Sequence, residues 1–257
     1  MTITEILKKE YEYLSRSYEV YGVFLYGSQN YGLATEESDL DSKALVIPSY
    51  TDLVLGTPVS KTIDFGCGEC DVKDIREMIK NYKKQNVNFL ETLYTVYFYV
   101  NPKYEAFHNQ LLNKRGEITH IDEKRALNAM NGMLMQAKKR MLNETEKTKA
   151  DIEKYGYHRK SFLNIIKMAN MIDKYAKGQF YNDVLDCSNL KKYRNAEVSK
   201  MTALMSAEKY DDFAAKTIKR YIEEKNPAID EETSKWLDNW TLQVIHSNIP
   251  SKLNLPL

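Results

Sequence analysis

A small turn and two carboxylates lie close together near the N-terminus of this sequence. Residues 23–26 form a short apolar run of β-favouring side chains, which predicts a buried strand. Gly27 and Ser28 follow this run directly, and Asp39 and Asp41 come after a connection of ten residues. Glycine lets the backbone approach a phosphate closely, and serine offers both its N–H and its hydroxyl. The order therefore favours a phosphate-binding turn beside a pair of cation ligands.

The two aspartates fall within residues 38–47, which predict a second strand that Pro48 closes. Alternate side chains of a strand project from one face, so Asp39 and Asp41 would lie side by side, roughly 7 Å apart along the backbone. Two such carboxylates repel each other unless a cation lies between them, and their oxygens suit Mg²⁺, with Mn²⁺ as the alternative ion. Two metals about 4 Å apart can clamp the attacking and leaving oxygens of a phosphoryl displacement. The alternative is that Ser38 and Asp39 cap a helix and that Asp41 is an exposed turn residue.

Charge is distributed unevenly along the 257 residues. Residues 1–113 carry 11 Lys and Arg against 16 Asp and Glu, a net of −5, whereas residues 114–200 carry 19 against 11, a net of +8. An acidic front part suits a cation site and a basic middle part suits an anionic partner, although two solvated helical faces of opposite sign would give the same pattern. The sequence has no run of 18 apolar residues and no secretory signal, so we expect a cytoplasmic protein without a membrane partner.

The apolar pattern of the chain changes from mixed to helical after about residue 120. Helical spacing predicts helices at 3–18, 73–85, 123–149, 159–177 and 205–224. A Gly-rich stretch near 62–72 is a candidate third strand, and a β-branched and aromatic run predicts a further strand at 94–100. Pro102 and Gly116 interrupt the pattern where the character changes. We therefore expect an α/β domain with a mixed sheet over residues 1–110, followed by an all-α domain over residues 111–257.

The three cysteines are too few and too scattered for a disulfide framework. Cys67 and Cys70 form a CxxC pattern, which can indicate zinc or redox chemistry. A zinc site needs two further ligands at a fitting spacing, and the four histidines of the chain are dispersed. We therefore expect two thiols near a turn, with neither zinc nor catalysis.

Several motifs of the chain resemble those of one enzyme superfamily. The stretch Gly27-Ser28-x-x-Tyr31-Gly32-Leu33, then Ser38-Asp39-x-Asp41, resembles the polymerase-β nucleotidyltransferases, in particular the predicted nucleotidyltransferases of the RNA repair pathway DNA polymerase beta family. The similarity covers roughly residues 20–225 and includes Asp71-Val72, Asn88-Phe89-Leu90-Glu91-Thr92-Leu93, Gly156-Tyr157-x-x-Lys160, Gly178 and Leu190-x-x-x-Arg194-Asn195.

The resemblance implies roles for the acidic residues and the turn. Gly27 and Ser28 would hold the triphosphate of an NTP, and Asp39 and Asp41 would bind Mg²⁺, with two ions expected. A third carboxylate from a neighbouring strand would bridge one metal and help to deprotonate the acceptor hydroxyl. Asp71 matches that position as the last residue of a third strand, and Asp64 and Glu69 are the rivals for this role.

The resemblance also implies contacts from basic residues. Lys43 would offset the carboxylates or touch phosphate, with a solvated lysine as the alternative. The family commonly carries histidines and an arginine on the first helix of its second domain, where this chain has Ser161, Asn164 and Lys167. Lysine cannot make the bidentate phosphate contact of arginine, so specificity is expected to differ.

Residues near the start of the 159–177 helix are further candidate nucleotide contacts. Lys160 and Lys167 lie two helical turns apart, so the spacing predicts that they share one face. With Arg159 they would form a ridge that follows a phosphate backbone, and Tyr157 would stack a terminal base. For each of them, the alternative is a surface or packing residue.

Three functions fit these observations. The first is transfer of a nucleoside monophosphate from an NTP to an acceptor hydroxyl, with release of pyrophosphate, and an RNA end is the acceptor that the family name and the basic middle segment favour. The second is the same transfer to a protein or a small molecule. The third is a catalytically silent module that binds a nucleotide or RNA, against which the presence of Asp39, Asp41 and Asp71 argues. The preferred NTP and the oligomeric state are not encoded in any pattern of the sequence.

Overall fold

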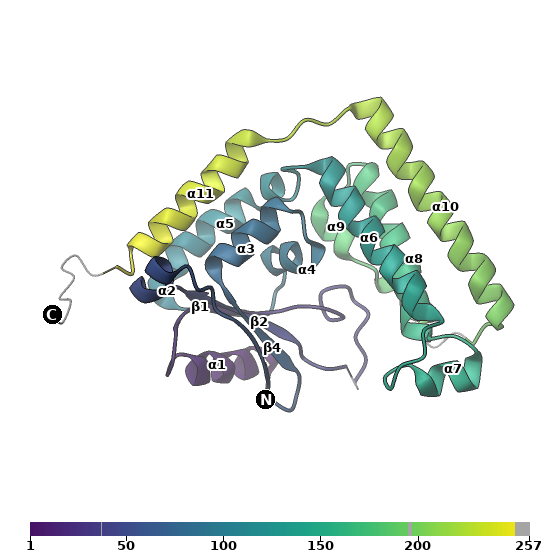
Figure 1. Cartoon of the computed structure of the whole chain (residues 1–257), viewed down its shortest axis with the longest axis horizontal. Coiled ribbons are helices and arrows are strands. Elements are labelled where there is room, and N and C mark those ends of the chain that lie inside the picture. The colour runs from purple at the N-terminus through teal and green to yellow at the C-terminus, as the bar shows by residue number, and fades with distance from the viewer. Residues whose placement is uncertain (37, 195–196, 250–257) are drawn as a thin grey trace.

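The centre of the molecule is a mixed sheet of five strands in the order β3-β4-β2-β1-β5 (Figure 1). The computed structural model describes residues 1–36, 38–194 and 197–249. The strands are Glu19–Leu25 (β1), Ser42–Ile47 (β2), Ser60–Asp64 (β3), Glu69–Asp74 (β4) and Phe98–Val100 (β5). β1 runs antiparallel to β2 and β5, β2 runs parallel to β4, and β3 and β4 form an antiparallel hairpin.

The two faces of the sheet bury alternate residues of the same strands. Ala44 and Val46 of β2 belong to the smaller of two hydrophobic clusters, which includes residues of α1 (Ile3–Leu14). Leu45 and Ile47 belong to the larger cluster, on the face that most of the helices cover. This alternation places Lys43 of β2 on the helix-covered face, because side chains two apart on a strand share a face.

The remaining helices fall into two groups. Those near the sheet are α2 (Tyr50–Leu55), α3 (Ile75–Lys83), α4 (Val87–Leu90), α5 (Glu105–Ile118), α11 (Glu231–His246) and the 3₁₀ turns η1 (Glu91–Leu93) and η2 (Pro102–Tyr104). Those beyond it are α6 (Glu123–Met141), α7 (Lys149–Tyr155), α8 (Arg159–Ala176), α9 (Tyr181–Leu185), η3 (Ser188–Tyr193) and α10 (Lys200–Lys225).

The last two helices, α10 and α11, lie at an angle to each other along the outer edge of the molecule (Figure 1). α10 packs on α8 and α6, whereas α11 returns to α3 and α5 beside the sheet. The Trp240 ring of α11 lies edge-on to Tyr21 of β1, with 5.9 Å between the ring centroids. A division between residues 110 and 111 would cut α5 and would separate α11 from its packing partners. Residues from both expected domains belong to one hydrophobic cluster. The position of the domain boundary therefore stays a prediction.

A mixed five-stranded sheet followed by a helical region is compatible with the fold class that the sequence predicts. Several bounds differ. The 38–47 strand begins only at Ser42, the 94–100 strand is reduced to β5, and the predicted strand near 62–72 is a hairpin of β3 and β4. The predicted 123–149 helix ends at Met141. After it, the Thr148 hydroxyl accepts the Thr145 N–H at 2.8 Å, and such side-chain bonds compete with helix continuation.

Among the helices of the described residues, none is long and apolar enough to span a lipid bilayer.

Candidate active site

The turn after β1 is fixed by a buried carboxylate. Gly27 has a φ of +90°, a left-handed conformation that favours glycine. Its N–H donates to Oε2 of Glu91 at 2.9 Å, and the Asn30 amide donates to the same oxygen at 3.1 Å. The Tyr31 hydroxyl donates to Oε1 at 3.2 Å. Glu91 therefore binds three donors of the turn, which also carries the half-buried Ser28.

The two predicted metal ligands precede β2 and lie beside this turn. The Tyr26 N–H donates to the carbonyl of Asp41 at 3.0 Å, which extends the β1–β2 pairing by one bond. The Asp41 carboxylate is half-buried and accepts the Glu69 N–H at 3.2 Å, whereas Asp39 is exposed. The structure thus places the Gly27 turn next to the Asp39–Asp41 segment, although the segment is not part of the strand itself.

The tip of the β3–β4 hairpin holds the aspartate segment in place. The Leu40 N–H donates to the carbonyl of Cys67 at 2.9 Å. A Cβ added to Gly68 would lie 2.4 Å from the carbonyl oxygen of Leu40, so only glycine fits there. The CxxC pattern is explained by this contact: Cys67 is exposed at the tip, Cys70 is buried in the sheet, and both are free thiols. Sequence reasoning missed Gly68, whose only signal was a glycine between two cysteines.

Asp71 lies on the neighbouring strand but is engaged by two lysines. The parallel register pairs it with Lys43, whose Nζ lies 3.1 Å from Oδ2, and the Lys73 Nζ lies 3.0 Å from Oδ1. Asp71 is in the middle of β4 rather than at its end. Across the part of the chain that the structure describes, no three His, Cys, Asp or Glu side chains are grouped closely enough to hold a metal. The three predicted carboxylates therefore form no closed cluster within the described residues.

Lys43 is buried beneath the site rather than exposed toward a ligand. Its side chain is 4% exposed, and its Nζ lies 4.0 Å from the ring centroid of Tyr26 and 4.7 Å from that of Phe89. Burial raises the pKa of the Tyr26 hydroxyl, and the charges of Asp41 and Asp71 raise it further. The charges of Asp41, before β2, and Asp71, on β4, therefore both act on the Tyr26 hydroxyl.

Glu91 is the main site residue that sequence reasoning left without a role. It is fully buried, and burial raises the pKa of its carboxyl from 4.5 to about 7, against the three hydrogen bonds of the turn and the nearby Lys167 charge, which lower it. Its signal in the sequence is an acidic residue inside the apolar run Phe89-Leu90-Glu91-Thr92-Leu93. Charged residues are seldom fully buried unless they are paired, so such a position marks a structural or functional carboxylate.

Lys167 of α8 completes this buried network from the helical side. Its side chain is nearly buried, and its Nζ lies 3.8 Å from the ring centroid of Tyr31, the residue that donates to Glu91. Burial lowers the pKa of the ammonium group, and the charge of Glu91 opposes this shift. Lys167 therefore lies against Tyr31 of the turn rather than facing solvent.

The expected ridge for a phosphate backbone is not present on α8. Of the two lysines predicted to share an exposed face, Lys160 is exposed and Lys167 is not. Arg159 is held by Asp151, whose Oδ1 lies 3.1 Å from its Nη2. Tyr157 is 0% exposed and packs edge-on to Phe162, so it cannot stack a terminal base in this conformation. The seven-residue spacing of Lys160 and Lys167 could not show that Tyr31 of the Gly27 turn covers Lys167.

The helical region also forms hydrogen bonds to the loop that leads to Asp39. The Cys187 N–H donates to the carbonyl of Tyr31 at 3.0 Å. The Arg194 guanidinium donates to the Leu33 carbonyl and, at 3.2 Å, to the Ser38 hydroxyl. Arg194 is thus a positioning group for the loop, while Asn195, the next residue of the resemblance, lies outside the described residues.

The donor set can be tested against the metal that the resemblance implies. Asp39 and Asp41 offer carboxylate oxygens in a half-open setting, and Mg²⁺ takes one or two protein carboxylates and fills its other positions with water and substrate phosphates. These two residues therefore fit the ion. Asp71 fits only if Lys73, whose side chain is 24% exposed, moves away from its Oδ1.

Comparison with known proteins gives a likeness in structure but none in sequence. The chain is similar to a solved structure described as a nucleotidyltransferase-like protein from Exiguobacterium sibiricum, with 10% identity and a TM-score of 0.34, over 98% of this chain and 83% of that chain. No protein-family model matches the sequence, and no curated protein matches it. At this identity and TM-score the likeness assigns neither a family nor an activity.

Proposed function

We propose that the protein is a Mg²⁺-dependent nucleotidyltransferase that moves a nucleoside monophosphate from an NTP to an acceptor hydroxyl. One observation carries the proposal: the Tyr26 N–H to Asp41 carbonyl bond of 3.0 Å sets a left-handed Gly27 turn directly beside two available carboxylates. The Ser28 hydroxyl of this turn suits phosphate oxygens, and the carboxylates suit the cation that accompanies a triphosphate.

The residues have separate tasks in this reaction. The Ser28 hydroxyl and nearby backbone N–H groups bind the triphosphate, and Asp39 and Asp41 hold the cation. When bound, Mg²⁺ supplies charge stabilisation at the phosphate oxygens and orients the triphosphate. The acceptor oxygen forms a bond to the α-phosphorus as the bond from that phosphorus to the bridging oxygen breaks, and pyrophosphate leaves. Asp71 takes the proton of the acceptor hydroxyl, directly or through water.

Asp71 can act as the base only after Lys73 moves away from Oδ1. Lys43 is fixed by burial and by the rings of Tyr26 and Phe89, so it stays with Oδ2. Lys73 is more exposed and lies beside Ser60, whose hydroxyl accepts from its Nζ at 2.8 Å. We propose that Lys73 moves to solvent or phosphate when the triphosphate binds, which frees Oδ1.

For the acceptor we propose the end of an RNA chain. The support is electrostatic, because residues 114–200 carry a net charge of +8 beside an acidic N-terminal part. Lys160 is an exposed lysine of this segment at the start of α8, the helix that also carries Lys167 toward the turn. A protein or small-molecule hydroxyl is the competing acceptor.

A second function is favoured by one specific contact. Both oxygens of Asp71 are engaged by lysines at 3.0–3.1 Å, which is the arrangement expected of a charge-neutralised site in a silent nucleotide-binding module. Such a module would bind an NTP through the Gly27 turn and release it unchanged.

The test is to incubate the protein with each of the four NTPs labelled on the α-phosphate, with Mg²⁺ and separate RNA, protein and small-molecule acceptor fractions. The proposal expects label in one fraction together with stoichiometric pyrophosphate. Binding of NTP without pyrophosphate release, in every fraction and with Mg²⁺ or Mn²⁺, would instead establish the silent module.

A further inference from the structure

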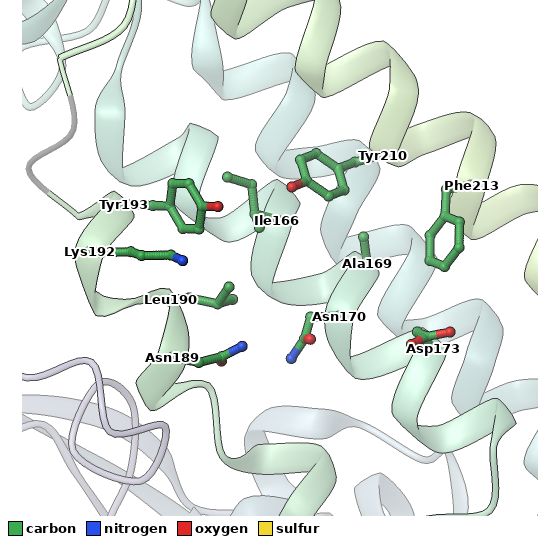
Figure 2. Close-up of a pocket in the computed structure, with 10 residues that line it drawn as sticks. All are labelled: Ile166, Ala169, Asn170, Asp173, Asn189, Leu190, Lys192, Tyr193, Tyr210 and Phe213. Atoms are coloured by element: carbon green, nitrogen blue, oxygen red, sulfur yellow. The ribbon is translucent and has the colours of Figure 1, made fainter.

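A recess lies within the helical region and is lined by none of the candidate site aspartates. It has a volume of about 210 Å³ and lies between α8, η3 and α10 (Figure 2). Small-molecule clefts usually measure roughly 300–1,000 Å³, so this one accommodates a single ring system rather than a whole NTP. It is lined by Ile166, Ala169, Asn170, Asp173, Asn189, Leu190, Lys192, Tyr193, Tyr210 and Phe213.

The walls of the recess combine rings with an aliphatic floor. Tyr193 comes from the end of η3, and Tyr210 and Phe213 come from one face of α10. Figure 2 shows the hydroxyls of Tyr193 and Tyr210 pointing toward each other across Ile166. Phe213 is 44% exposed and Ile166 is buried, so a flat apolar surface continues from the core to the opening. A flat aromatic ligand would bury its apolar faces against this surface, which favours its binding.

Two amides supply directional groups on the opposite side. The side chains of Asn170 on α8 and Asn189 on η3 point toward one another in Figure 2. An amide offers two donors and one acceptor oxygen, so the pair can read the edge of a ring that carries both kinds of group. The Asn170 Nδ2 lies 3.7 Å from the Cys187 sulfur, a weak contact that leaves its carbonyl for a ligand.

Charge at the rim favours an anionic substituent. The carboxylate of Asp173 is paired with Lys177, whose Nζ lies 2.6 Å from Oδ2. Lys192 is exposed, and within the described ranges it makes no ion pair. Figure 2 shows its ammonium group directed toward the recess from the side opposite Asp173. The Lys192 Nζ lies 5.2 Å from the centroid of the neighbouring Tyr193 ring, so the rim has a cation beside an aromatic wall and an acid neutralised by Lys177.

We infer that this recess binds the base of a nucleotide, with the amides on its edge and Lys192 on its phosphate. The choice of a nucleotide over another planar heterocycle rests on the proposed function. The ligand is a nucleoside monophosphate unit, either a free nucleotide or the terminal residue of an RNA.

Occupancy of this recess is connected to the candidate active site. η3 forms one wall, and the residues at its two ends, Cys187 and Arg194, bond to the loop between Gly27 and Asp39. A ligand that orders η3 would therefore order that loop. The bound unit is expected to raise the apparent affinity of the Gly27 turn for an NTP, since the two sites would share a rigid wall.

The experiment is equilibrium dialysis of the full chain, in EDTA and without NTP, against labelled nucleoside 5′-monophosphates, the matching nucleosides and a short single-stranded RNA. Asn189→Ala, at an exposed position of η3, should weaken the nucleoside and the monophosphate alike, by several-fold, as expected for a lost hydrogen bond. Lys192→Ala should weaken the monophosphate several-fold and leave the nucleoside unchanged. Lys191→Ala is the matched control, an adjacent exposed lysine that does not line the recess and should bind as the wild type does.

The RNA arm identifies the source of the unit. If Lys192→Ala weakens RNA as much as it weakens the monophosphate, the recess holds an RNA end, and if only the monophosphate binds, it holds a free nucleotide. Failure of every base to bind, or wild-type binding by both Asn189→Ala and Lys192→Ala, would overturn the inference.

The double variant Asp39→Asn and Asp41→Asn separates this site from the proposed function. It should lose transfer yet keep the affinity for the monophosphate. A wild-type protein that binds in this way but transfers nothing refutes the transferase and leaves the recess, whereas transfer without such binding refutes the recess alone.

Discussion

The carboxylate of Glu91 accepts the backbone N–H of Gly27 at 2.9 Å, so a buried acid of η1 sets the turn beside the candidate metal ligands. The same carboxylate binds Asn30 and Tyr31 and faces the ammonium group of Lys167. The turn is therefore held by a carboxyl group whose pKa is raised by burial to about 7.

This linkage predicts a pH dependence of stability. The folded-state pKa of Glu91 is raised from 4.5 to about 7, so the folded protein holds a proton that the unfolded chain releases. Its contribution is fully present below pH 4.5 and is lost as the pH rises through about 7. One pKa unit corresponds to about 1.4 kcal/mol, so the loss amounts to a few kcal/mol at most.

Glu91→Gln should remove this loss. The glutamine carbonyl can accept from Gly27 and Asn30, and its NH₂ can donate to the Tyr31 hydroxyl, so the packing is kept. We expect the free energy of unfolding in urea to fall between pH 5 and 8 in the wild type and to stay flatter in the variant. Glu12→Gln, at an exposed position of α1, should follow the wild type. Equal slopes for Glu91→Gln and the wild type would contradict the role of Glu91.

Gly68→Ala should disturb the aspartate segment. The new methyl group would lie 2.4 Å from the Leu40 carbonyl oxygen, so the hairpin tip must move away. Overpacking of this kind costs about 1–3 kcal/mol, and we expect weaker Mg²⁺-dependent NTP binding as well as a lower Tm. Gly116→Ala is the control, because a Cβ at this position of α5 meets nothing within 4 Å. It should keep binding and raise stability by about 0.5–1 kcal/mol. An unchanged NTP affinity in Gly68→Ala would show that the hairpin contact does not position Asp41.

Lys73→Ala tests the rearrangement proposed for Asp71. Removal of this lysine leaves Oδ1 of Asp71 without its partner at 3.0 Å, so that oxygen is available before the NTP binds. A partly exposed pair contributes about 0.2–1 kcal/mol, so the Mg²⁺ concentration for half-maximal transfer should fall by a factor between roughly 1.4 and 5. Lys61→Ala, on an exposed position of β3, should leave it unchanged. A rise in the Mg²⁺ requirement of Lys73→Ala would mean that the lysine itself serves the reaction.

The RNA acceptor predicts a steep salt dependence. Each phosphate neutralised on a single strand contributes about −0.7 to the slope of log affinity against log salt. Lys160→Ala should flatten the slope by about one such unit. Lys167→Ala should instead reduce NTP affinity, because Lys167 faces the turn through Tyr31. Lys8→Ala on α1 is the control for a general loss of positive charge. RNA binding through this helix would be contradicted by an RNA affinity that does not change with salt. It would also be contradicted if the salt slope of Lys160→Ala equalled that of the wild type.

Local sequence patterns predicted the order of the site elements along the chain but not the contacts between distant residues. A buried run before Gly27, and a second apolar run after Asp41, were sufficient to predict β1 and β2 in sequence. The pairing of Lys43 with Asp71 depends on the parallel register of β2 and β4, which are joined through α2 and β3, and no local pattern encodes that register. Glu91 was hidden for the same reason, since its partners lie sixty or more residues away along the chain.

The helical region shows the same division. Helical periodicity predicted α8 and α10 to within a few residues, because each buries a continuous apolar stripe. It did not show that Tyr157 is covered and that Lys167 turns inward, because burial depends on which helix packs on which face. It also missed α11, whose return to the sheet through Trp240 is a tertiary contact.

The most direct test of the account is transfer of label from an α-phosphate-labelled NTP by Asp39→Asn and Asp41→Asn. Asparagine keeps the shape of each side chain, and at residue 41 it keeps the oxygen that accepts the Glu69 N–H. Both variants should fold as the wild type does and lose activity by roughly 10²-fold or more, since a cation site loses a charged ligand. Asp238→Asn, on an exposed position of α11, should keep full activity. Full Mg²⁺-dependent transfer by either Asp39→Asn or Asp41→Asn would contradict the assignment of this pair as the metal site.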